Sequence, residues 1–326
     1  MLWLLMKHRT RRTADAAQTR VQVLSVLVNK ATSFDSSDAA LVTALIQSRR
    51  LLSEPSRFAF RLSEPSRAGD RAGGWRVAVP AGVDLAEPYV ELSYVDAVRE
   101  RHRRPLLDCV TARFEDVAPV RQFRWSRGER HFAGWYWAAT TGQHVGFESW
   151  LERDRLLLMD FDPEVMGIAS QPFWLHWHDG ERDRRHAPDY FVRRTDGSAA
   201  VVDVRADERI EPKDAEAFEV TRLACSQAGW RFERVGVPDA VLLANVRWLS
   251  RYRHPRCLNG PVADRLRELF ATGGPLMVGA DAAGDRLATL PVLFHLLWLQ
   301  ELTAEAMSTE LMGPRTVVSL ANGGAQ

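Results

Sequence analysis

The residues with the clearest chemical potential are three separated carboxylates, Glu152, Asp189 and Asp203, followed by Arg205. Residues i and i+2 of a β-strand point to the same face, so Asp203 and Arg205 project side by side if 198–206 is a strand. A TDG turn just before that strand would return the chain alongside Asp189. Mg²⁺ (or Mn²⁺) binds a few carboxylates together with water and phosphate oxygens. The acids therefore predict a divalent metal site, where the metal would activate water and neutralise charge on a phosphodiester.

Asp203 is the most unusual of these residues, because it interrupts the apolar run 199–204. An ionised carboxylate in a buried strand is costly unless it meets a cation or hydrogen-bond donors. A structural ion pair with Arg205 or Arg193 satisfies that requirement as well as a metal does. Asp203 alone leaves both interpretations open.

The elements that must position these acids follow from hydrophobic spacing and turn residues. The range 146–165 predicts a helix of about three turns, since apolar residues recur at helical spacing and the pattern stops at Asp162-Pro163. Strands are predicted at 165–178, 186–194, 198–206 and 230–237, and a second helix at 213–229. This order gives an α/β fold with a mixed αβββαβ core.

The predicted core occupies one of three segments. Residues 1–87 predict a poorly structured N-terminal extension, with a direct LSEPSR duplication and few apolar faces. Residues 88–256 hold the core domain. Residues 257–326 contain helical patterns at 262–271, 290–300 and 303–311 and then the β-prone run TVVSLA, which is the order of a small winged-helix-like domain. A small helical bundle that only packs on the core or on a partner is the alternative.

Composition limits the class of protein. The chain has 326 residues, a net charge of +1 and 46% hydrophobic residues, which is enough to bury a core. Its three cysteines are isolated, so no disulfide framework or paired-thiolate zinc site is expected. We read neither a signal peptide nor a membrane-spanning helix, and expect a cytoplasmic, nucleoid-associated bacterial protein without a membrane partner.

The stretch FESWLERDRLLLMDFDPEVMGIASQPFWLHW, followed by RRHAPDYFVRR and VVDVRAD, resembles the catalytic domain of TnsA-type endonucleases, subunits of heteromeric transposases. The resemblance covers about 146–236. Asp189 in the PD dipeptide and Asp203-Val204-Arg205 resemble the PD-(D/E)XK signature of restriction-endonuclease-like nucleases, with arginine where that superfamily has lysine.

The resemblance implies a function for each residue. Glu152, Asp189 and Asp203 would bind Mg²⁺ or Mn²⁺, and Arg205 would occupy the lysine position of a DNA endonuclease that cuts 5′ transposon ends. Glu148, one turn earlier than Glu152, competes for the helix position. Double-stranded DNA, a DDE transposase subunit and an AAA ATPase are the implied partners, and the tail is implied to be a winged helix that contacts the ATPase.

Four alternatives stay open. Arginine cannot act as a base, so Arg205 either stabilises charge electrostatically or marks a catalytically degraded DNA-binding and scaffolding subunit. Lys213, near the start of the next predicted helix, is a less favoured candidate for the role of the signature lysine that Arg205 replaces. A stand-alone restriction or repair nuclease is the third functional class. A zinc site at His176, His178 and His186 is conceivable, although no cysteine or carboxylate stands at ligand spacing.

Overall fold

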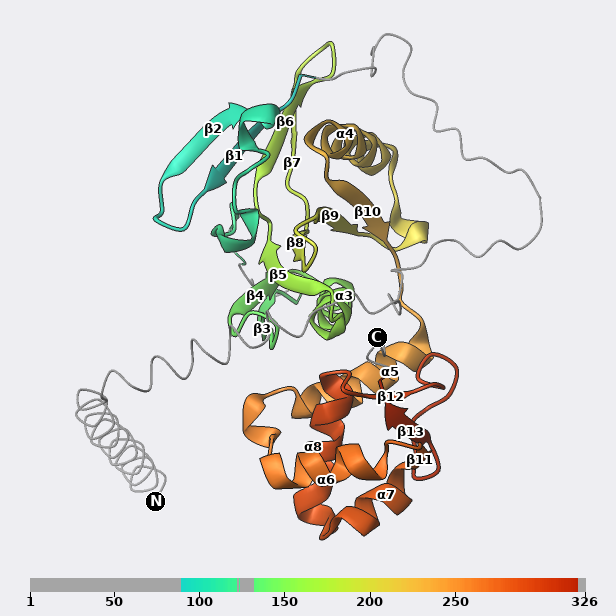
Figure 1. Ribbon diagram of the computed structural model, residues 1–326. Coiled ribbons are helices and arrows are strands. Elements are labelled where there is room, and N and C mark those ends of the chain that lie inside the picture. Colours follow the sequence, from blue (N-terminus) through green and yellow to red (C-terminus); the bar gives the residue numbers. More distant parts are fainter. Residues whose placement is uncertain (1–88, 122, 124–131, 322–326) are drawn as a thin grey trace, which may run out of the picture. The chain divides into compact units, whose positions relative to one another are not determined.

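The computed structural model describes residues 89–121, 123 and 132–321 (Figure 1). The predicted extension at 1–87 lies outside the described residues. All described residues belong to one compact unit. The predicted domain boundary near residue 256 stays a prediction.

The central element is a four-stranded mixed sheet in the order β10-β9-β8-β5 (Figure 1). Its strands are β5 (Val165–Ser170), β8 (Tyr190–Arg194), β9 (Ala199–Val204) and β10 (Arg231–Val235). β5, β8 and β9 pair antiparallel, whereas β10 pairs parallel to β9. Parallel neighbours need a crossover, which helix α4 (Pro212–Ala228) supplies. The α/β class is therefore confirmed.

The two helices of this region begin and end at residues suited to those positions. The Ser149 side chain caps α3 (Trp150–Phe161) by accepting from Glu152 N, and Pro163 follows the helix end. In α4, Glu211 and Asp214 form a capping box, and Gly229 ends the helix in the left-handed conformation with φ of 70°. The helices predicted at 146–165 and 213–229 are both present.

Alternating residues of the sheet give it two buried faces, and each face carries one helix. Leu156 and Leu157 of α3 belong to the same apolar cluster as Tyr190 and Val202. Val220 and Ala224 of α4 belong to a second cluster, with Phe191 and Val201. Since successive strand residues point to opposite faces, α3 and α4 cover opposite sides of the sheet (Figure 1).

Two predicted strands are each divided between two sheets. A second four-stranded sheet has the order β2-β1-β6-β7. It is built from β1 (Glu91–Val95), β2 (Arg101–Pro105), β6 (Trp174–His178) and β7 (Asp183–His186). The single strand predicted at 165–178 is therefore wrong, and the strand predicted at 186–194 is confirmed over 190–194, with His186 belonging to β7. Gln171 takes a left-handed φ of 44° and Pro172 has no N–H for a ladder, so β5 stops before β6 begins.

A short hairpin lies between β2 and α3 along the chain. It joins β3 (Gly134–Trp137) to β4 (His144–Phe147) as an antiparallel pair. Its second strand leads into Ser149 and α3, so it positions the first turn of the helix, which carries Glu152.

The C-terminal part combines helices with a three-stranded sheet in the order β11-β13-β12. Its elements are α5 (Ala240–Leu249), α6 (Gly260–Leu269), β11 (Gly274–Pro275), α7 (Leu276–Ala283), α8 (Arg286–Trp298), β12 (Leu302–Ala304) and β13 (Val317–Leu320). The helix predicted at 303–311 is wrong, because Leu302 and Ala304 are buried in strand pairing with β13 and turns follow. The three α-helices after residue 257 in the described structure are α6, α7 and α8, and α7 was not predicted.

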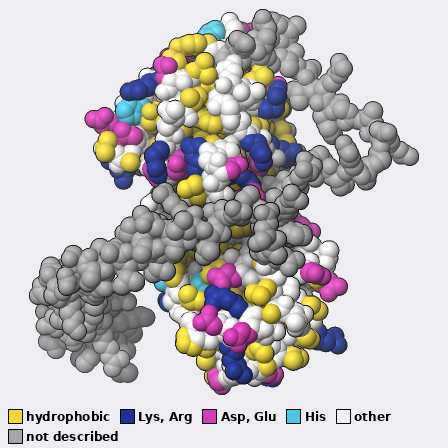
Figure 2. All heavy atoms as spheres, in the orientation of Figure 1, with side chains coloured by type: hydrophobic (Ala, Val, Ile, Leu, Met, Phe, Trp, Pro, Cys, Tyr) yellow, Lys and Arg dark blue, Asp and Glu magenta, His cyan; other side chains and the backbone are white. Residues whose placement is uncertain are grey.

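The described surface carries mixed charge. Figure 2 shows Lys or Arg side chains interspersed with Asp or Glu on the face it presents. None of the helices in the described ranges has both the length and the apolar character needed to cross a membrane.

Candidate functional site

Asp189 and Asp203 meet at one edge of the central sheet. Tyr190 pairs with Val202, so the residue before β8 lies beside the residue after Val202 on β9. The Asp189 backbone N–H donates to Asp203 Oδ1 at 3.4 Å, and the Val204 N–H donates to Asp189 Oδ2 at 2.7 Å. The folded-back hairpin predicted from the TDG turn is present, with Gly197 at a φ of 84°.

Glu152 reaches the same region from the first turn of α3. The Ser149 hydroxyl donates to Glu152 Oε1 at 2.8 Å, and the Glu148 N–H donates to Oε2 at 2.7 Å. Burial raises the pKa of Glu152, against the opposing effect of these two hydrogen bonds. The carboxylate is therefore fixed in position although its ionised form is costly.

The pKa of Asp189 shows that the three acids share one electrostatic field. Burial raises this pKa well above its ordinary value, and the charges of Glu152 and then Asp203 raise it further. The hydrogen bond from Val204 opposes the shift. Carboxylates that repel one another in a buried place are stabilised by a shared cation.

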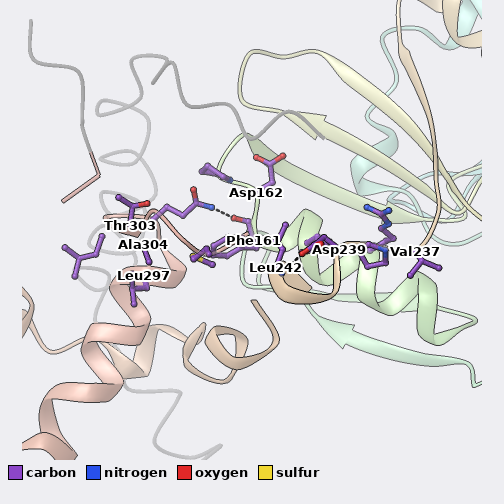
Figure 3. Close-up of a pocket in the computed structure, with 15 residues that line it drawn as sticks. Phe161, Asp162, Val237, Asp239, Leu242, Leu297, Thr303 and Ala304 are labelled. Carbon is purple, nitrogen blue, oxygen red and sulfur yellow. Dashed lines mark hydrogen bonds between the residues drawn. The ribbon is translucent and has the colours of Figure 1, made fainter. Parts of the chain in front are cut away.

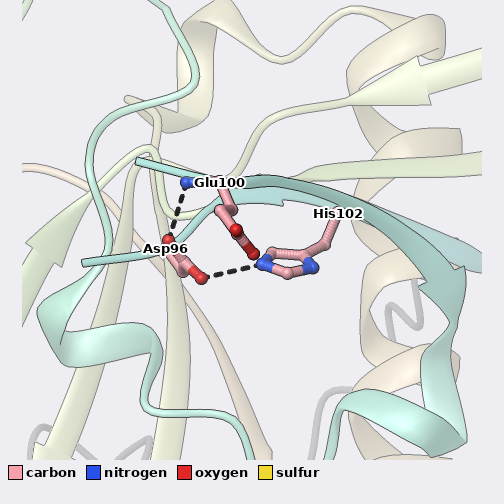
Figure 4. A group of neighbouring side chains, drawn as sticks. All are labelled: Asp96, Glu100 and His102. Carbon is pink, nitrogen blue, oxygen red and sulfur yellow. Dashed lines mark hydrogen bonds and ion pairs between the residues drawn. The ribbon is translucent and has the colours of Figure 1, made fainter. Parts of the chain in front are cut away.

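The three acids are neighbours without forming a closed cage. In the described ranges, the one group of at least three metal-ligating side chains with ligand atoms all within 4.8 Å is Asp96, Glu100 and His102. Figure 4 shows Asp96 bonded both to the Glu100 backbone and to the His102 ring. These bonds account for that cluster as a hairpin contact of β1 and β2. The carboxylate oxygens of Glu152, Asp189 and Asp203 do not all lie within 4.8 Å of one another. A metal shared by these three acids stays a prediction.

Asp203 is 2% exposed and has a partner that the sequence analysis did not assign. His186 Nε2 lies 3.0 Å from both carboxylate oxygens of Asp203. Burial lowers the pKa of His186, but the charge and hydrogen bond of Asp203 outweigh this effect, so that the pKa is raised. The alternative ion pairs do not form, because Arg193 contacts Glu115 and Arg205 contacts Asp214.

Arg205 is held by the first turn of α4. Its Nη2 and Nε donate to Asp214 Oδ2 at 2.7 and 3.2 Å. Lys213 pairs with Glu211 at the surface, where its side chain is 71% exposed. The structure thus brings Asp189 together with Glu152 and Asp203, and places a carboxylate partner on Arg205.

Two polar residues beside these acids escaped the sequence analysis. Gln171 is 1% exposed, and both polar atoms of its amide are buried without a hydrogen-bond partner in the described structure. Its backbone N–H donates to Asp189 O at 2.8 Å. Arg121 donates through Nη2 to Glu148 Oε2 at 2.7 Å. No local pattern singles out either residue, since their importance comes from segments that meet only in the fold.

The histidines of the conceivable zinc site have separate partners. His176 bonds to Ser93 Oγ at 2.7 Å, and the Gly180 N–H donates to His178 Nδ1 at 3.0 Å. His186 bonds to Asp203. These three side chains are therefore engaged in different local contacts.

Arginines of the basic segment 182–194 are largely paired. The ion pairs are Arg184 with Asp179, Arg193 with Glu115 and Arg194 with Glu164. Arg185 instead lies over the Trp174 ring, with its Cζ 4.3 Å from the ring centroid. Pairing of this kind reduces the positive field that a DNA backbone would meet.

An apolar cavity of about 280 Å³ lies apart from the three acids. Figure 3 shows Phe161, Asp162, Leu297 and Thr303 around it, with Gln300 bonded to the Phe161 carbonyl. Burial raises the pKa of Asp162 to about 6, although Arg194 opposes this shift. None of the three predicted metal ligands lines the cavity.

No protein-family model matches the chain, and no curated protein matches it.

Proposed function

We propose that the chain is the metal-dependent DNA endonuclease subunit of a TnsA-like transposase, hydrolysing phosphodiesters at the 5′ transposon ends. The observation that carries the proposal is the meeting of Asp189 and Asp203 at one edge of the sheet, where the Asp189 N–H donates to Asp203 Oδ1 and the Val204 N–H donates to Asp189 Oδ2. Burial, and then the charges of Glu152 and Asp203, raise the pKa of Asp189. Strongly perturbed carboxylates that converge from separate elements are typical of active sites.

The order of elements supports the nuclease part of the proposal. The sequence α3, β5, β8, β9, α4, β10 follows the αβββαβ order that the resemblance implies for a restriction-endonuclease-like core, with β6 and β7 inserted after β5. The order α6, β11, α7, α8, β12, β13 is that of a winged helix. We assign this C-terminal part to contacts with DNA or with an ATPase partner.

The residues present fit a hard divalent cation. Glu152, Asp189 and Asp203 would hold Mg²⁺ or Mn²⁺, which prefer carboxylate oxygens. The mutual repulsion of the carboxylates favours such a ligand. When bound, the cation lowers the pKa of a water molecule and neutralises charge on the phosphate.

The chain's own residues orient this site. Ser149 and the Glu148 backbone fix the two oxygens of Glu152. His186 holds both oxygens of Asp203, and the Val204 N–H holds one oxygen of Asp189. Such contacts set the direction of each carboxylate before a cation or DNA arrives.

Partner proteins complete the proposed activity. The net charge is +1 and most arginines near the site are paired with acids, so little of the described surface would attract a DNA backbone by charge alone. We therefore assign selection of the transposon end to a DDE transposase subunit and an AAA ATPase.

The proposal is tested by titrating Mn²⁺ into the metal-free full-length chain in a calorimeter. We expect saturable binding by wild type and at least about tenfold weaker binding by Asp203→Asn, because a lost ligand costs more than the 10- to 100-fold typical of supporting contacts. Asp264→Asn, a surface acid on α6, serves as the matched control and should bind as wild type does. Equal binding by wild type and Asp203→Asn would refute the proposal.

A second function is favoured by one contact. Arg205, which occupies the lysine position of the signature, forms an ion pair with Asp214 and so has less capacity to contact a phosphate. A catalytically inactive subunit that keeps the fold as a DNA-binding scaffold would show this feature. It predicts no heat that depends on Asp203, so the same titration separates the two functions.

A further inference from the structure

Arg121 lies against the proposed metal site from a segment that the sequence analysis left outside it. Its Nη2 donates to Glu148 Oε2 at 2.7 Å. Its charge lowers the pKa of Glu152 and also lowers the pKa of His186, the partner of Asp203. The guanidinium therefore lies near Glu148 and Glu152 on the α3 side of the site, and near His186, the partner of Asp203, on its other side.

Backbone hydrogen bonds fix the position of Arg121 relative to Asp189. The N–H of Val120 donates to the Gln171 carbonyl at 3.0 Å, and the Gln171 N–H donates to the Asp189 carbonyl at 2.8 Å. Backbone hydrogen bonds thus connect residue 120 to residue 171 and residue 171 to residue 189, although the three are far apart in the sequence. Arg121 is held beside the acids by the fold rather than by its side chain alone.

The guanidinium has unused donor capacity. Arginine carries five N–H groups in a planar fork suited to phosphate. Arg121 makes one bond to Glu148, its Nε is buried without a hydrogen-bond partner in the described structure, and its side chain is 38% exposed. The Arg121 Cζ lies 5.8 Å from the Trp174 ring centroid, and Arg185 lies over the same ring at 4.3 Å. Two guanidinium groups thus lie at Trp174 beside the acids, and that of Arg121 is partly open to solvent.

The arginine in the signature is placed differently. Arg205 gives two of its donors to Asp214, so its charge is paired with a structural carboxylate at the start of α4. Glu148, the partner of Arg121, belongs instead to the acidic cluster itself, since its charge raises the pKa of both Glu152 and Asp189.

We infer that Arg121, rather than Arg205, is the residue that binds the DNA phosphate at the metal site. The inference rests on the proposed function. In the absence of DNA, the positive charge of Arg121 partly neutralises Glu148 and Glu152. It therefore lowers the affinity of these carboxylates for a divalent cation. With DNA present, its free donors contact a phosphate oxygen beside the cation.

The test measures two binding constants of the full-length chain, for wild type and for Arg121→Gln. Mn²⁺ affinity is measured by calorimetry without DNA. Affinity for a fluorescent 20-base-pair duplex is measured by anisotropy in Ca²⁺, over a series of salt concentrations. We expect Arg121→Gln to bind Mn²⁺ about threefold or more tightly, because a competing positive charge is gone. It should bind the duplex about tenfold more weakly, with a salt slope reduced by about one.

Three comparison variants sharpen the result. Arg121→Lys keeps the charge but loses the fork, so it should restore the wild-type Mn²⁺ affinity and only part of the duplex affinity. Arg205→Gln should weaken duplex binding less than Arg121→Gln does. Arg222→Gln removes an exposed arginine of α4 that pairs with Glu219, and should change neither constant.

The opposite movement of the two constants distinguishes phosphate binding from a structural contact. If Arg121→Gln weakens both constants, or changes neither, the inference is overturned. A larger loss of duplex binding in Arg205→Gln, or no measurable duplex binding by wild type, also overturns it. Failure of the proposed function would instead be seen as wild-type Mn²⁺ binding that Asp203→Asn leaves unchanged.

Discussion

Asp189→Asn is expected to reduce cleavage at the 5′ transposon ends by more than about 100-fold. The substitution removes the charge of the one acid that lies in the fields of both Glu152 and Asp203. Loss of a supporting contact at a metal site already costs about 10- to 100-fold, and a direct ligand should cost more. The measurement is the rate of strand nicking at element ends in Mg²⁺, by the full-length chain with its partner subunits.

Two controls show that the loss is chemical. Asp264→Asn, an exposed acid of α6, should cleave as wild type does. The Asp189→Asn protein should be at least as stable as wild type at pH values above the ordinary pKa range of aspartate. Because the folded-state pKa of Asp189 is raised, its ionisation costs stability as pH rises through that value, and asparagine is spared this cost. Cleavage at the wild-type rate by Asp189→Asn would remove this acid from the mechanism.

Phe114→Ala is expected to lower the free energy of unfolding by about 3 to 5 kcal/mol. Phe114 is fully buried, and its ring centroid lies 5.0 Å from that of Phe173, 5.5 Å from that of Phe191 and 5.6 Å from that of Trp230. These rings join the start of β6, strand β8 and the start of β10, so the cluster packs the sheet that carries Asp189. Urea unfolding followed by tryptophan fluorescence measures the loss.

Leu107→Ala is the matched control for that experiment. Leu107 lies in the same connecting segment but is 62% exposed, so its truncation should change stability by less than about 0.5 kcal/mol. A loss below about 1 kcal/mol in Phe114→Ala would mean that the aromatic cluster does not hold the sheet together.

The parts of the fold that the sequence predicted are those set by local signals. The helix stop at Asp162-Pro163, Gly229 at the end of α4 and the TDG turn between β8 and β9 are each found where the sequence predicted them. Helical spacing in α3 and α4 was also sufficient, because one face of each helix must be buried on the sheet.

The parts that the sequence did not predict depend on distant partners. The break at Gln171-Pro172 has a local cause, since Gln171 takes a left-handed φ and proline has no N–H for a ladder, but the pairing of the second half with β1 in another sheet depends on a distant segment. Likewise the segment 303–311 has helical composition, but pairing with β13 draws its first residues into a strand. Tertiary contacts decide the strand pairing in both places.

The candidate site divides in the same way. The three acids could be named from residue type and strand pattern, and the fold places Asp189 beside the other two. The partners could not be named. His186 takes the place expected for an arginine beside Asp203, Asp214 holds Arg205, and Arg121 enters from a segment with no signature of its own.

The most direct measurement of the central claim is the anomalous scattering of Mn²⁺ in crystals of the full-length chain. We expect one strong peak, or two adjacent peaks, bonded to carboxylate oxygens of Glu152, Asp189 and Asp203, and lost in Asp189→Asn crystals. A Mn²⁺ peak only at Asp96, Glu100 and His102, or no peak at the three acids under saturating metal, would contradict the account.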